Sequence, residues 1–334
     1  MSALPEGCTA RPLTPDDVDA VAALLAAAEA VDETGEHLDA DDLTEWWVND
    51  LVDLPRDGRV VCAVDGTVVG WATAIASRGV RDGFRVWLEG RVHPDRRGQG
   101  IGRHLLAWQL RRGAEHHAEQ HPDLPGRLTV SVWPAMGSLE GLLRRSAFEP
   151  ERWYFDMERP LTDLPRPEPA PGVDLVPFTW DRDEEVRLAH NVAFTDHFGS
   201  TERDQVSWRA WFTGQKAFRP DLSVLALADG AVVGYVLAYV YEADTRATGV
   251  RQSHFGQIGV LPRARGRGVA SAAIAAALRA AADAGCGTAG LQVDSENSTG
   301  ALRLYQRLGF QQLRTRVSWA HHLAPLPEAA PAGR

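Results

Sequence analysis

The chain has 334 residues, 45 of them acidic and 35 basic, and its formal net charge of −10 makes it a poor match to nucleic acid or to an anionic membrane surface. No segment is long and apolar enough to span a membrane, and the N-terminus lacks the basic and then apolar pattern of a signal peptide. Three scattered cysteines do not suit a disulfide framework or a zinc site, so the composition predicts a cytoplasmic protein with no nucleic-acid or membrane partner.

Both halves of the chain predict the same order of elements: helix, strand hairpin, strand, glycine-rich turn, helix, strand, helix and strand. The hairpin of the second half is signalled by Asp229-Gly230 between two apolar runs. Because strands and helices do not alternate regularly, this order indicates an α/β fold with a mixed sheet. In the second half we expect helices at residues 181–198, 205–212, 268–284 and 298–308 and strands at 224–228, 232–241, 255–260, 289–293 and 312–321.

A glycine-rich hexapeptide occurs twice, as RGQGIG at residues 97–102 and as RGRGVA at residues 265–270. Each copy follows an apolar strand-like run and opens a long helix-like run. The hairpins repeat as well, because residues 65–71 resemble residues 229–235. Repetition at this spacing predicts two tandem domains related by internal duplication.

The length fits this division, because 334 residues are enough for two domains that each bury a core. Residues 161–172 are too rich in proline for a helix or a central strand and suit a semi-rigid linker. We therefore expect an N-terminal domain at residues 1–160, this linker, a C-terminal domain at 173–325 and a loose tail at 326–334.

The glycine-rich turns have the properties of a phosphate site. A pyrophosphate needs several backbone N–H groups that converge on it at a helix N-terminus, and side chains there would block its approach. Arginines in the turns add complementary charge. An ordinary strand-to-helix turn is the alternative, and the dinucleotide-binding fingerprint is absent. The candidate cofactor-binding residues are Arg265, Gly266, Arg267, Gly268, Val269 and Ala270 in the second half and Arg97, Gly98, Gln99, Gly100, Ile101 and Gly102 in the first.

Downstream of the second turn, Asn297, Tyr305 and the run LGF at residues 308–310 follow. With the turn, this pattern resembles the GNAT superfamily of acyl-CoA N-acyltransferases over nearly the whole chain, and the tandem arrangement is similar to that of mycothiol synthase and related actinobacterial proteins. The resemblance implies acetyl-CoA as the cofactor. It also implies that the strand before the turn parts from the next strand to admit the acyl-pantetheine arm, with Gly256 and Gly259 marking a bulge or a close approach.

The resemblance gives two of these residues a role. Tyr305 would protonate the departing thiolate of coenzyme A, and Asn297 would hydrogen-bond the pantetheine arm or nearby backbone. The first half has lost both side chains and is expected to be catalytically degenerate, although its intact turn leaves it able to hold coenzyme A. Alignment of the halves pairs Leu143 with Tyr305, Ala135 with Asn297 and Ala147 with Gly309.

A protonated amine has no lone pair, so acyl transfer needs a group that takes a proton from the acceptor. By strand register, His254 occupies the position at which mycothiol synthase and several relatives carry a catalytic glutamate, and Glu242 is the alternative base. A purely structural histidine is an equal interpretation of His254. The backbone N–H near Val260 is expected to stabilise negative charge on the acyl oxygen, and Val92 is the corresponding residue of the first half.

Acceptor specificity is expected in residues 191–200, where polar and aromatic residues alternate. Asp196 could neutralise a substrate amine, His197 could hydrogen-bond it, and Trp208 could form a wall. The alternatives are a helix C-terminus that ends at Gly199 and core packing of the tryptophan.

The sequence therefore predicts an acetyl-CoA-dependent N-acetyltransferase whose C-terminal domain transfers acetyl by direct attack to a primary amine of a small molecule. We expect a monomer or a homodimer. Two alternatives stay open: a non-catalytic acyl-CoA-binding sensor or scaffold, and a protein acetyltransferase that acts on lysine or on N-termini.

Overall fold

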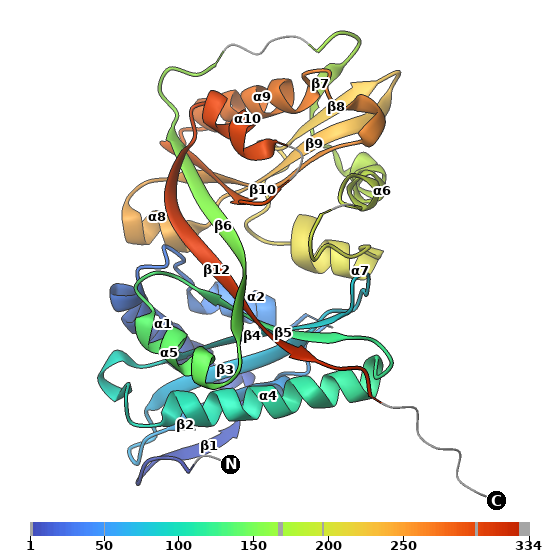
Figure 1. Cartoon of the computed structure of the whole chain (residues 1–334). Coiled ribbons are helices and arrows are strands. Elements are labelled where there is room, and N and C mark those ends of the chain that lie inside the picture. The colour runs from blue at the N-terminus through green and yellow to red at the C-terminus, as the bar shows by residue number, and fades with distance from the viewer. Residues whose placement is uncertain (1–2, 50, 166–169, 196, 298–299, 327–334) are drawn as a thin grey trace, which may run out of the picture. The chain divides into compact units, whose positions relative to one another are not determined.

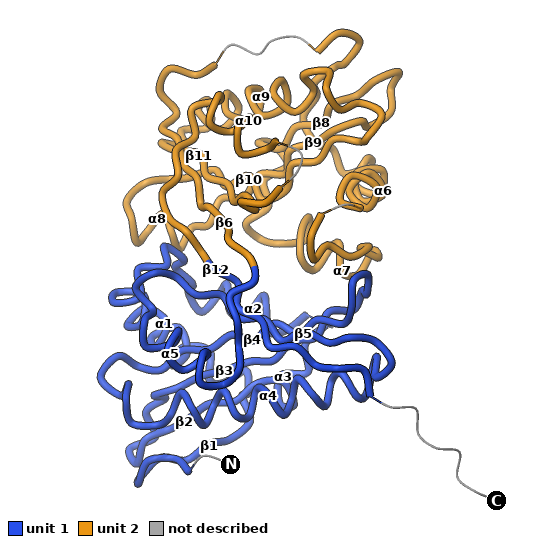
Figure 2. Tube along the Cα trace, viewed as in Figure 1, with its two compact units in different colours: residues 1–151, 317–334 blue, residues 152–316 orange. Residues whose placement is uncertain are grey.

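The computed structural model describes residues 3–49, 51–165, 170–195, 197–297 and 300–326. The chain forms two compact units (Figure 2). Unit 1 consists of residues 1–151 and 317–334, and unit 2 consists of residues 152–316. Parts of the expected linker, residues 166–169, and most of the expected tail, residues 327–334, lie outside the described residues. Within the described ranges, no helix has the length and apolar character needed to cross a membrane.

Unit 1 is built on a mixed sheet with the strand order β1-β2-β3-β4-β5-β12. Neighbouring strands are antiparallel except β4 and β5, which are parallel. Helix α4 packs on one face of this sheet, and α1 and α2 pack on the other (Figure 1). The elements are β1 (Thr9–Pro12), α1 (Val18–Asp32), α2 (Ala40–Trp47), α3 (Leu54–Asp57), β2 (Gly58–Cys62), β3 (Val68–Ala76), β4 (Phe84–Val92), α4 (Ile101–Gln120), β5 (Gly126–Val132), α5 (Gly137–Arg145) and β12 (Gln311–Leu323).

Unit 2 repeats this architecture with the strand order β7-β8-β9-β10-β11-β6, in which only β10 and β11 are parallel. Helices α9 and α10 cover one face, and α6 and α7 cover the other (Figure 1). The elements are β6 (Glu149–Pro160), β7 (Asp174–Pro177), α6 (Asp183–Ala193), α7 (Gln205–Trp208), β8 (Val224–Ala228), β9 (Ala231–Tyr239), α8 (Glu242–Thr248), β10 (Gln252–Val260), α9 (Val269–Asp283), β11 (Thr288–Asp294) and α10 (Ala301–Arg307).

Strand β9 shows how the sequence builds both layers. Its odd-numbered residues from Tyr235 to Tyr239 pack toward α6 and α7, while Val236 and Ala238 pack toward α9 and α10, as the two-residue period of a strand requires. The predicted hairpin is confirmed, because Asp229 and Gly230 adopt the positive φ angles, 50° and 78°, that a tight hairpin turn needs. The α/β class with a mixed sheet is confirmed as well.

The predicted elements of the second half are present with shifted ends. The helix expected at residues 181–198 stops at Ala193, whose carbonyl accepts a hydrogen bond from Arg265 instead of continuing the helix. The helix expected at 298–308 is described from Ala301, and residues 298 and 299 lie outside the described residues. Helix α8 was not predicted.

The two halves of the sequence exchange their last strands. Residues 154–160 of β6 pair with β11 in unit 2, and residues 317–323 of β12 pair with β5 in unit 1. Each sheet is therefore completed by a strand from the other half of the chain. This division differs from the expected domains at 1–160 and 173–325, because the two strands follow their pairing partners and not their position in the sequence.

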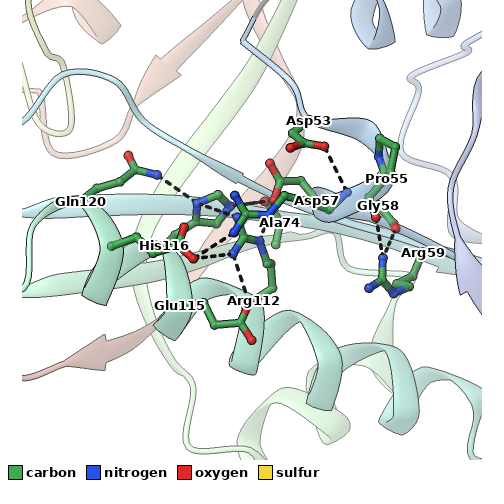
Figure 3. Close-up of polar contacts among 12 residues, drawn as sticks. Asp53, Pro55, Asp57, Gly58, Arg59, Ala74, Arg112, Glu115, His116 and Gln120 are labelled. Atoms are coloured by element: carbon green, nitrogen blue, oxygen red, sulfur yellow. Dashed lines mark hydrogen bonds and ion pairs between the residues drawn. The ribbon is translucent and has the colours of Figure 1, made fainter.

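A buried charged cluster fixes α4 to the start of β2 in unit 1 (Figure 3). Arg112 Nε donates to Asp57 Oδ1 at 2.7 Å, and His116 Nε2 lies 3.0 Å from the same oxygen. The other nitrogen of His116, Nδ1, faces the donors Gln120 Nε2 and Arg112 Nη2, so Nε2 carries the imidazole hydrogen. Burial alone would raise the pKa of Asp57, but the contacts with His116 and Arg112 hold it below its ordinary value. The cluster therefore stabilises unit 1 above about pH 4, and this stabilisation is lost as the pH falls through the folded-state pKa of Asp57.

The strand exchange predicts that a substitution in the second half of the sequence destabilises unit 1. Trp319 in β12 is 3% exposed and belongs to the core under α4. We expect Trp319→Ala to lower the stability of unit 1 by about 3 kcal/mol and to speed hydrogen exchange in α4 and β5. Leu313→Ala, in the same strand but 53% exposed, is the control. Faster exchange in α9 and β11 alone would contradict the exchange of strands.

Candidate active site

The candidate site of unit 2 begins where two strands part. Strands β10 and β11 pair only at residues 252–254 of β10, and β10 then continues to Val260 paired with β9 alone. The N–H of Leu261 donates to the carbonyl of Val233 on β9 at 2.9 Å. Because backbone N–H groups alternate along a strand, the N–H of Val260 points toward the edge that β11 has left. This edge offers strand-like hydrogen bonds to a ligand.

A bulge in β10 shapes the same region. The pairing with β9 shifts register between Phe255 and Gln257, which places Gly256 at the bulge. A side chain on Gly256 would begin 2.7 Å from the ring of Tyr239, and one on Gly259 would begin 2.5 Å from the hydroxyl of Tyr235. The expected bulge and close approach are therefore confirmed, and each glycine is required by the tyrosine ring that covers it.

The second glycine-rich turn forms an open helix N-terminus. Gly266 and Gly268 adopt φ angles of 73° and 80°, and Gly268 caps α9, whose first residues are Val269 and Ala270. Apart from the glycines themselves and their chain neighbours, no atom of the described residues lies within 4 Å of the point where a side chain on either glycine would begin. The first N–H groups of a helix have no partner within it, so they face this open space and suit an anion.

Among the described residues, the arginines of this turn contact backbone carbonyls. Arg265 Nε donates to the carbonyl of Val260 at 3.2 Å and Arg265 Nη2 to that of Ala193 at 2.9 Å, while Arg267 Nη2 donates to the carbonyl of Pro171 at 3.3 Å. Backbone carbonyls orient both guanidinium groups without neutralising them. The turn therefore combines oriented N–H groups with two positive charges.

Tyr305 lies on α10 in the core cluster beneath α9 and is 7% exposed. Burial raises the pKa of its hydroxyl to about 12, so the side chain keeps its proton at neutral pH. Asn297 lies in the turn after β11, where its N–H donates to the carbonyl of Asp294 at 3.1 Å. The residues between Asn297 and Gly300 lie outside the described residues.

The two candidate bases differ in their surroundings. His254 pairs with Tyr239 across the sheet, is partly buried, and has the ring of Tyr241 at 6.1 Å. Burial lowers the pKa of His254, although Asp156 opposes this shift, so the imidazole is neutral at pH 7 and able to accept a proton. Glu242 is the first residue of α8 and is exposed.

Of the three candidate residues for acceptor binding, the structure describes two. Asp196 lies outside the described residues. His197 is half-buried, its Nδ1 lies 3.1 Å from the carbonyl of Phe198, and burial lowers its pKa. Trp208 is 1% exposed, and its indole N–H donates to Asp183 at 2.7 Å. This position corrects the expectation of a pocket wall, because a tryptophan enclosed on all sides packs the core beneath α6 and α7.

Sequence reasoning missed Arg152. This residue of β6 donates to Asp294 at 3.0 Å, and its guanidinium lies 4.3 Å over the ring of Phe198. It thereby connects the stretch after α6 with the end of β11. No local pattern signals this contact, because Arg152 comes from the first half of the sequence and reaches unit 2 only through the strand exchange.

Unit 1 has the same backbone arrangement. Gly98 and Gly100 adopt φ angles of 77° and 96°, and Gly100 caps α4, which begins with Ile101 and Gly102. Strands β4 and β5 pair only at residues 84–87 of β4. The N–H of His93 donates to Val69, so the N–H of Val92 points to the open edge, as that of Val260 does in unit 2.

The side chains around this turn and strand of unit 1 differ from those of unit 2 in type or in partner. Arg97 forms a bidentate ion pair with buried Asp32, at 2.7 and 2.8 Å, which Arg265 does not have among the described residues. By its pairing across the sheet, Trp87 is the counterpart of His254. Leu143, which is fully buried, is the counterpart of Tyr305. Gln99 donates to the carbonyl of Asp95 at 3.3 Å. In addition, the pairing of β4 with β3 runs without the shift that marks the bulge in β10.

The alignment of Leu143 with Tyr305 is supported by the backbone that follows. Phe148 donates its N–H to the carbonyl of Leu143 at 3.1 Å, as Phe310 does to that of Tyr305 at 3.0 Å. Ala147 adopts the positive φ that Gly309 adopts in the second half. The two helix ends are therefore equivalent, and the missing tyrosine is a substitution at a preserved position.

A model of the acetyltransferase (GNAT) family matches residues 21–124 and 184–310, which together make up more than half of the chain. The chain belongs to this family. It is an N-acetyltransferase with two tandem GNAT regions, and GNAT relatives use acetyl-CoA.

Curated relatives match along nearly the full length. The mycothiol acetyltransferase of Frankia alni is 32% identical over 331 residues, which cover 92% of each chain. That of Streptomyces coelicolor is 30% identical over 314 residues, which cover 89% of each chain. A GCN5-related N-acetyltransferase from Sphaerobacter thermophilus superposes with a TM-score of 0.78 at 25% identity, covering 98% of this chain and 99% of that one. A tandem GNAT protein from the clavulanic acid biosynthesis pathway, at 19% identity and a TM-score of 0.67 over 96% of this chain and 100% of that one, shares the fold.

Acetyl-CoA fits the features of unit 2. Its pyrophosphate suits the open N-terminus of α9 with Gly266 and Gly268, where no side chain fills the space. Its amide-bearing arm suits the edge of β10 at Val260, where a strand partner is missing. Both features are backbone features, so they depend on the glycines and on the parting of the strands.

Proposed function

We propose that the chain transfers acetyl from acetyl-CoA to a primary amine of a small molecule and that unit 2 carries the reaction. The full-length similarity to mycothiol acetyltransferases, which are named for a small molecule, supports a small acceptor. The observation that carries the proposal is the contrast between the two units. Both have the open helix N-terminus and the parted strands, but only unit 2 pairs them with a histidine at the bulged strand and a buried tyrosine.

Each residue of unit 2 then has one task. Bound acetyl-CoA supplies an acetyl group already activated as a thioester. The N-terminus of α9 holds the phosphates, and the N–H of Val260 lies where it can donate to an oxygen that gains negative charge. Neutral His254 takes a proton from the acceptor ammonium, directly or through a water. Tyr305 holds a proton on its hydroxyl for the departing sulfur.

The raised pKa of Tyr305 is compatible with this task. A tyrosine with a pKa of about 12 is a weak acid beside a thiol with an ordinary pKa of about 8.5. Burial in an apolar site raises the pKa of a thiol as well, because it disfavours the thiolate. The two pKa values therefore approach each other in the closed site, and the proton stays on Tyr305 until the thiolate forms.

The same contrast argues against a sensor or scaffold, and kinetics with different acceptors distinguish the protein acetyltransferase. A sensor or scaffold would bind acetyl-CoA without amine-dependent release of coenzyme A, and the retained Tyr305 and His254 favour turnover. A protein acetyltransferase would acetylate lysine or N-terminal peptides faster than free amines. Measuring released thiol with free amines and with peptides separates all three.

Removal of the proposed acid should lower the rate and spare cofactor binding. We expect Tyr305→Phe to reduce kcat by about 100-fold, because acid catalysis contributes at least that much, while KM for acetyl-CoA changes little. Leu143→Met, at the equivalent position of unit 1, should leave kcat unchanged. Steady-state kinetics of the full chain checks this, and full activity of Tyr305→Phe would remove the tyrosine from the mechanism.

The proposed base predicts the pH dependence. Because burial lowers the pKa of His254 below its ordinary value of 6.5, kcat should fall only as the pH drops below about 6.5 and should be level above it. His254→Gln should lower kcat by about 100-fold and abolish this acid limb. Glu242→Gln should retain both the value of kcat and its fall at low pH. If the fall of kcat at low pH is lost in Glu242→Gln and kept in His254→Gln, the base is Glu242.

A further inference from the structure

Gln257 follows the bulge in β10 and lies on the same face of the sheet as His254. In a regular strand, two residues three positions apart point to opposite faces. Opposite these two residues on β9 lie Leu237 and Tyr239, which are two residues apart and therefore share a face. The bulge thus places Gln257 beside the candidate base, on the side of the sheet that faces α6 and α7.

The carboxamide of Gln257 has a fixed orientation. Its Oε1 accepts a hydrogen bond of 2.7 Å from the hydroxyl of Tyr239. Burial raises the pKa of Tyr239 well above its ordinary value, so the hydroxyl keeps its proton and remains a donor. An amide whose oxygen is held in this way directs its NH2 group away from the tyrosine.

The NH2 group of Gln257 is accessible and has no partner among the described residues. Its Nε2 donates to no acceptor there and is not enclosed by the protein. The side chain as a whole is partly buried, and the neighbouring Gly256 is exposed. The amide therefore presents two N–H donors in the part of β10 that β11 no longer covers.

The arm of acetyl-CoA suits a different part of this strand. Strand-like hydrogen bonds lie in the plane of the sheet, and the N–H of Val260 is directed to the open edge in that plane. The side chain of Gln257 leaves the plane on the face that carries His254. An acceptor amine has to reach this face to lose its proton to the histidine. The N–H donors of Gln257 therefore suit an oxygen of the acceptor.

We propose that Gln257 positions the acceptor by donating a hydrogen bond to an oxygen close to the reacting amine. The favoured substrates are then amines with a neighbouring hydroxyl or carbonyl group, and simple alkyl amines are poor substrates. This inference rests on the proposed function, because it names the substrate class of the same site. Gln257 determines specificity without taking part in proton transfer, and Tyr239 acts by holding its amide.

The test compares matched pairs of amines that differ in one polar group. Release of coenzyme A by the full chain is measured with ethanolamine and propylamine, with 2-aminocyclohexanol and cyclohexylamine, and with glycinamide and isobutylamine. For at least one pair, kcat/KM should favour the oxygen-bearing amine, and Gln257→Leu should reduce this preference about tenfold, as the loss of one hydrogen bond to the substrate predicts. Differences in the reactivity of the amines cancel, because the same pair is compared in both proteins. The first two pairs test a hydroxyl and the third a carbonyl.

Two further variants separate positioning of the acceptor from packing of the strand. Tyr239→Phe keeps the ring over Gly256 but removes the hydroxyl that holds the amide, so it should lower the preference by a smaller factor. Gln252→Leu is the matched control on the same strand and face. The Nε2 of Gln252 already donates to Glu158 at 2.6 Å, so its loss should leave the preference unchanged.

Two results would overturn the inference. One is a preference, in rate or in binding, that the unsubstituted protein lacks for every pair or that Gln257→Leu leaves unchanged. The other is an equal fall of kcat for both amines of every pair in Gln257→Leu, which would assign the amide to the acetyl oxygen. Calorimetric binding of the same amines to the complex with coenzyme A separates this inference from the proposed function. A binding preference that depends on Gln257 but comes without release of coenzyme A would contradict the proposed function alone.

Discussion

The structure depends on the early end of the pairing between β10 and β11. A parallel pair that stops after three residues leaves the N–H of Val260 without a strand partner at the point where α9 begins. The bulge at Gly256 supports this parting, and two tyrosine rings that close over Gly256 and Gly259 keep the strand in place. A cofactor arm can then act as the missing strand, and its phosphates reach the helix N-terminus at the end of the same strand.

Duplication has produced two copies of this backbone with different chemistry. In unit 1 the arginine of the glycine-rich turn forms an ion pair with Asp32, and Trp87 and Leu143 stand at the positions of the base and the acid. The backbone that suits a phosphate needs only glycines and a helix start, whereas proton transfer needs particular side chains. Unit 1 therefore retains the backbone elements of a cofactor site. Because the last strands are exchanged, the sheet of each unit also needs a strand from the other half of the sequence.

Local patterns in the sequence predicted the features of the fold that depend on residues close together in the chain. The hairpin at Asp229, the turn at Gly268 and the helix that carries Tyr305 depend on residues close in the chain, and all were predictable. The strand exchange was not, because two similar halves offer each last strand two equivalent partners. Arg152 escaped notice for the same reason, because its importance lies in contacts with residues distant in sequence.

The central claim, that unit 2 alone catalyses, is tested most directly by spoiling each turn in the full chain. Gly266→Asp and Gly98→Asp are matched substitutions, because both glycines have positive φ, which aspartate tolerates, and open space around them. Each places a negative charge where phosphate would bind. We expect Gly266→Asp to reduce amine-dependent release of coenzyme A by at least about 100-fold and Gly98→Asp to change it less than about twofold. Loss of activity in Gly98→Asp with retention in Gly266→Asp would contradict the account.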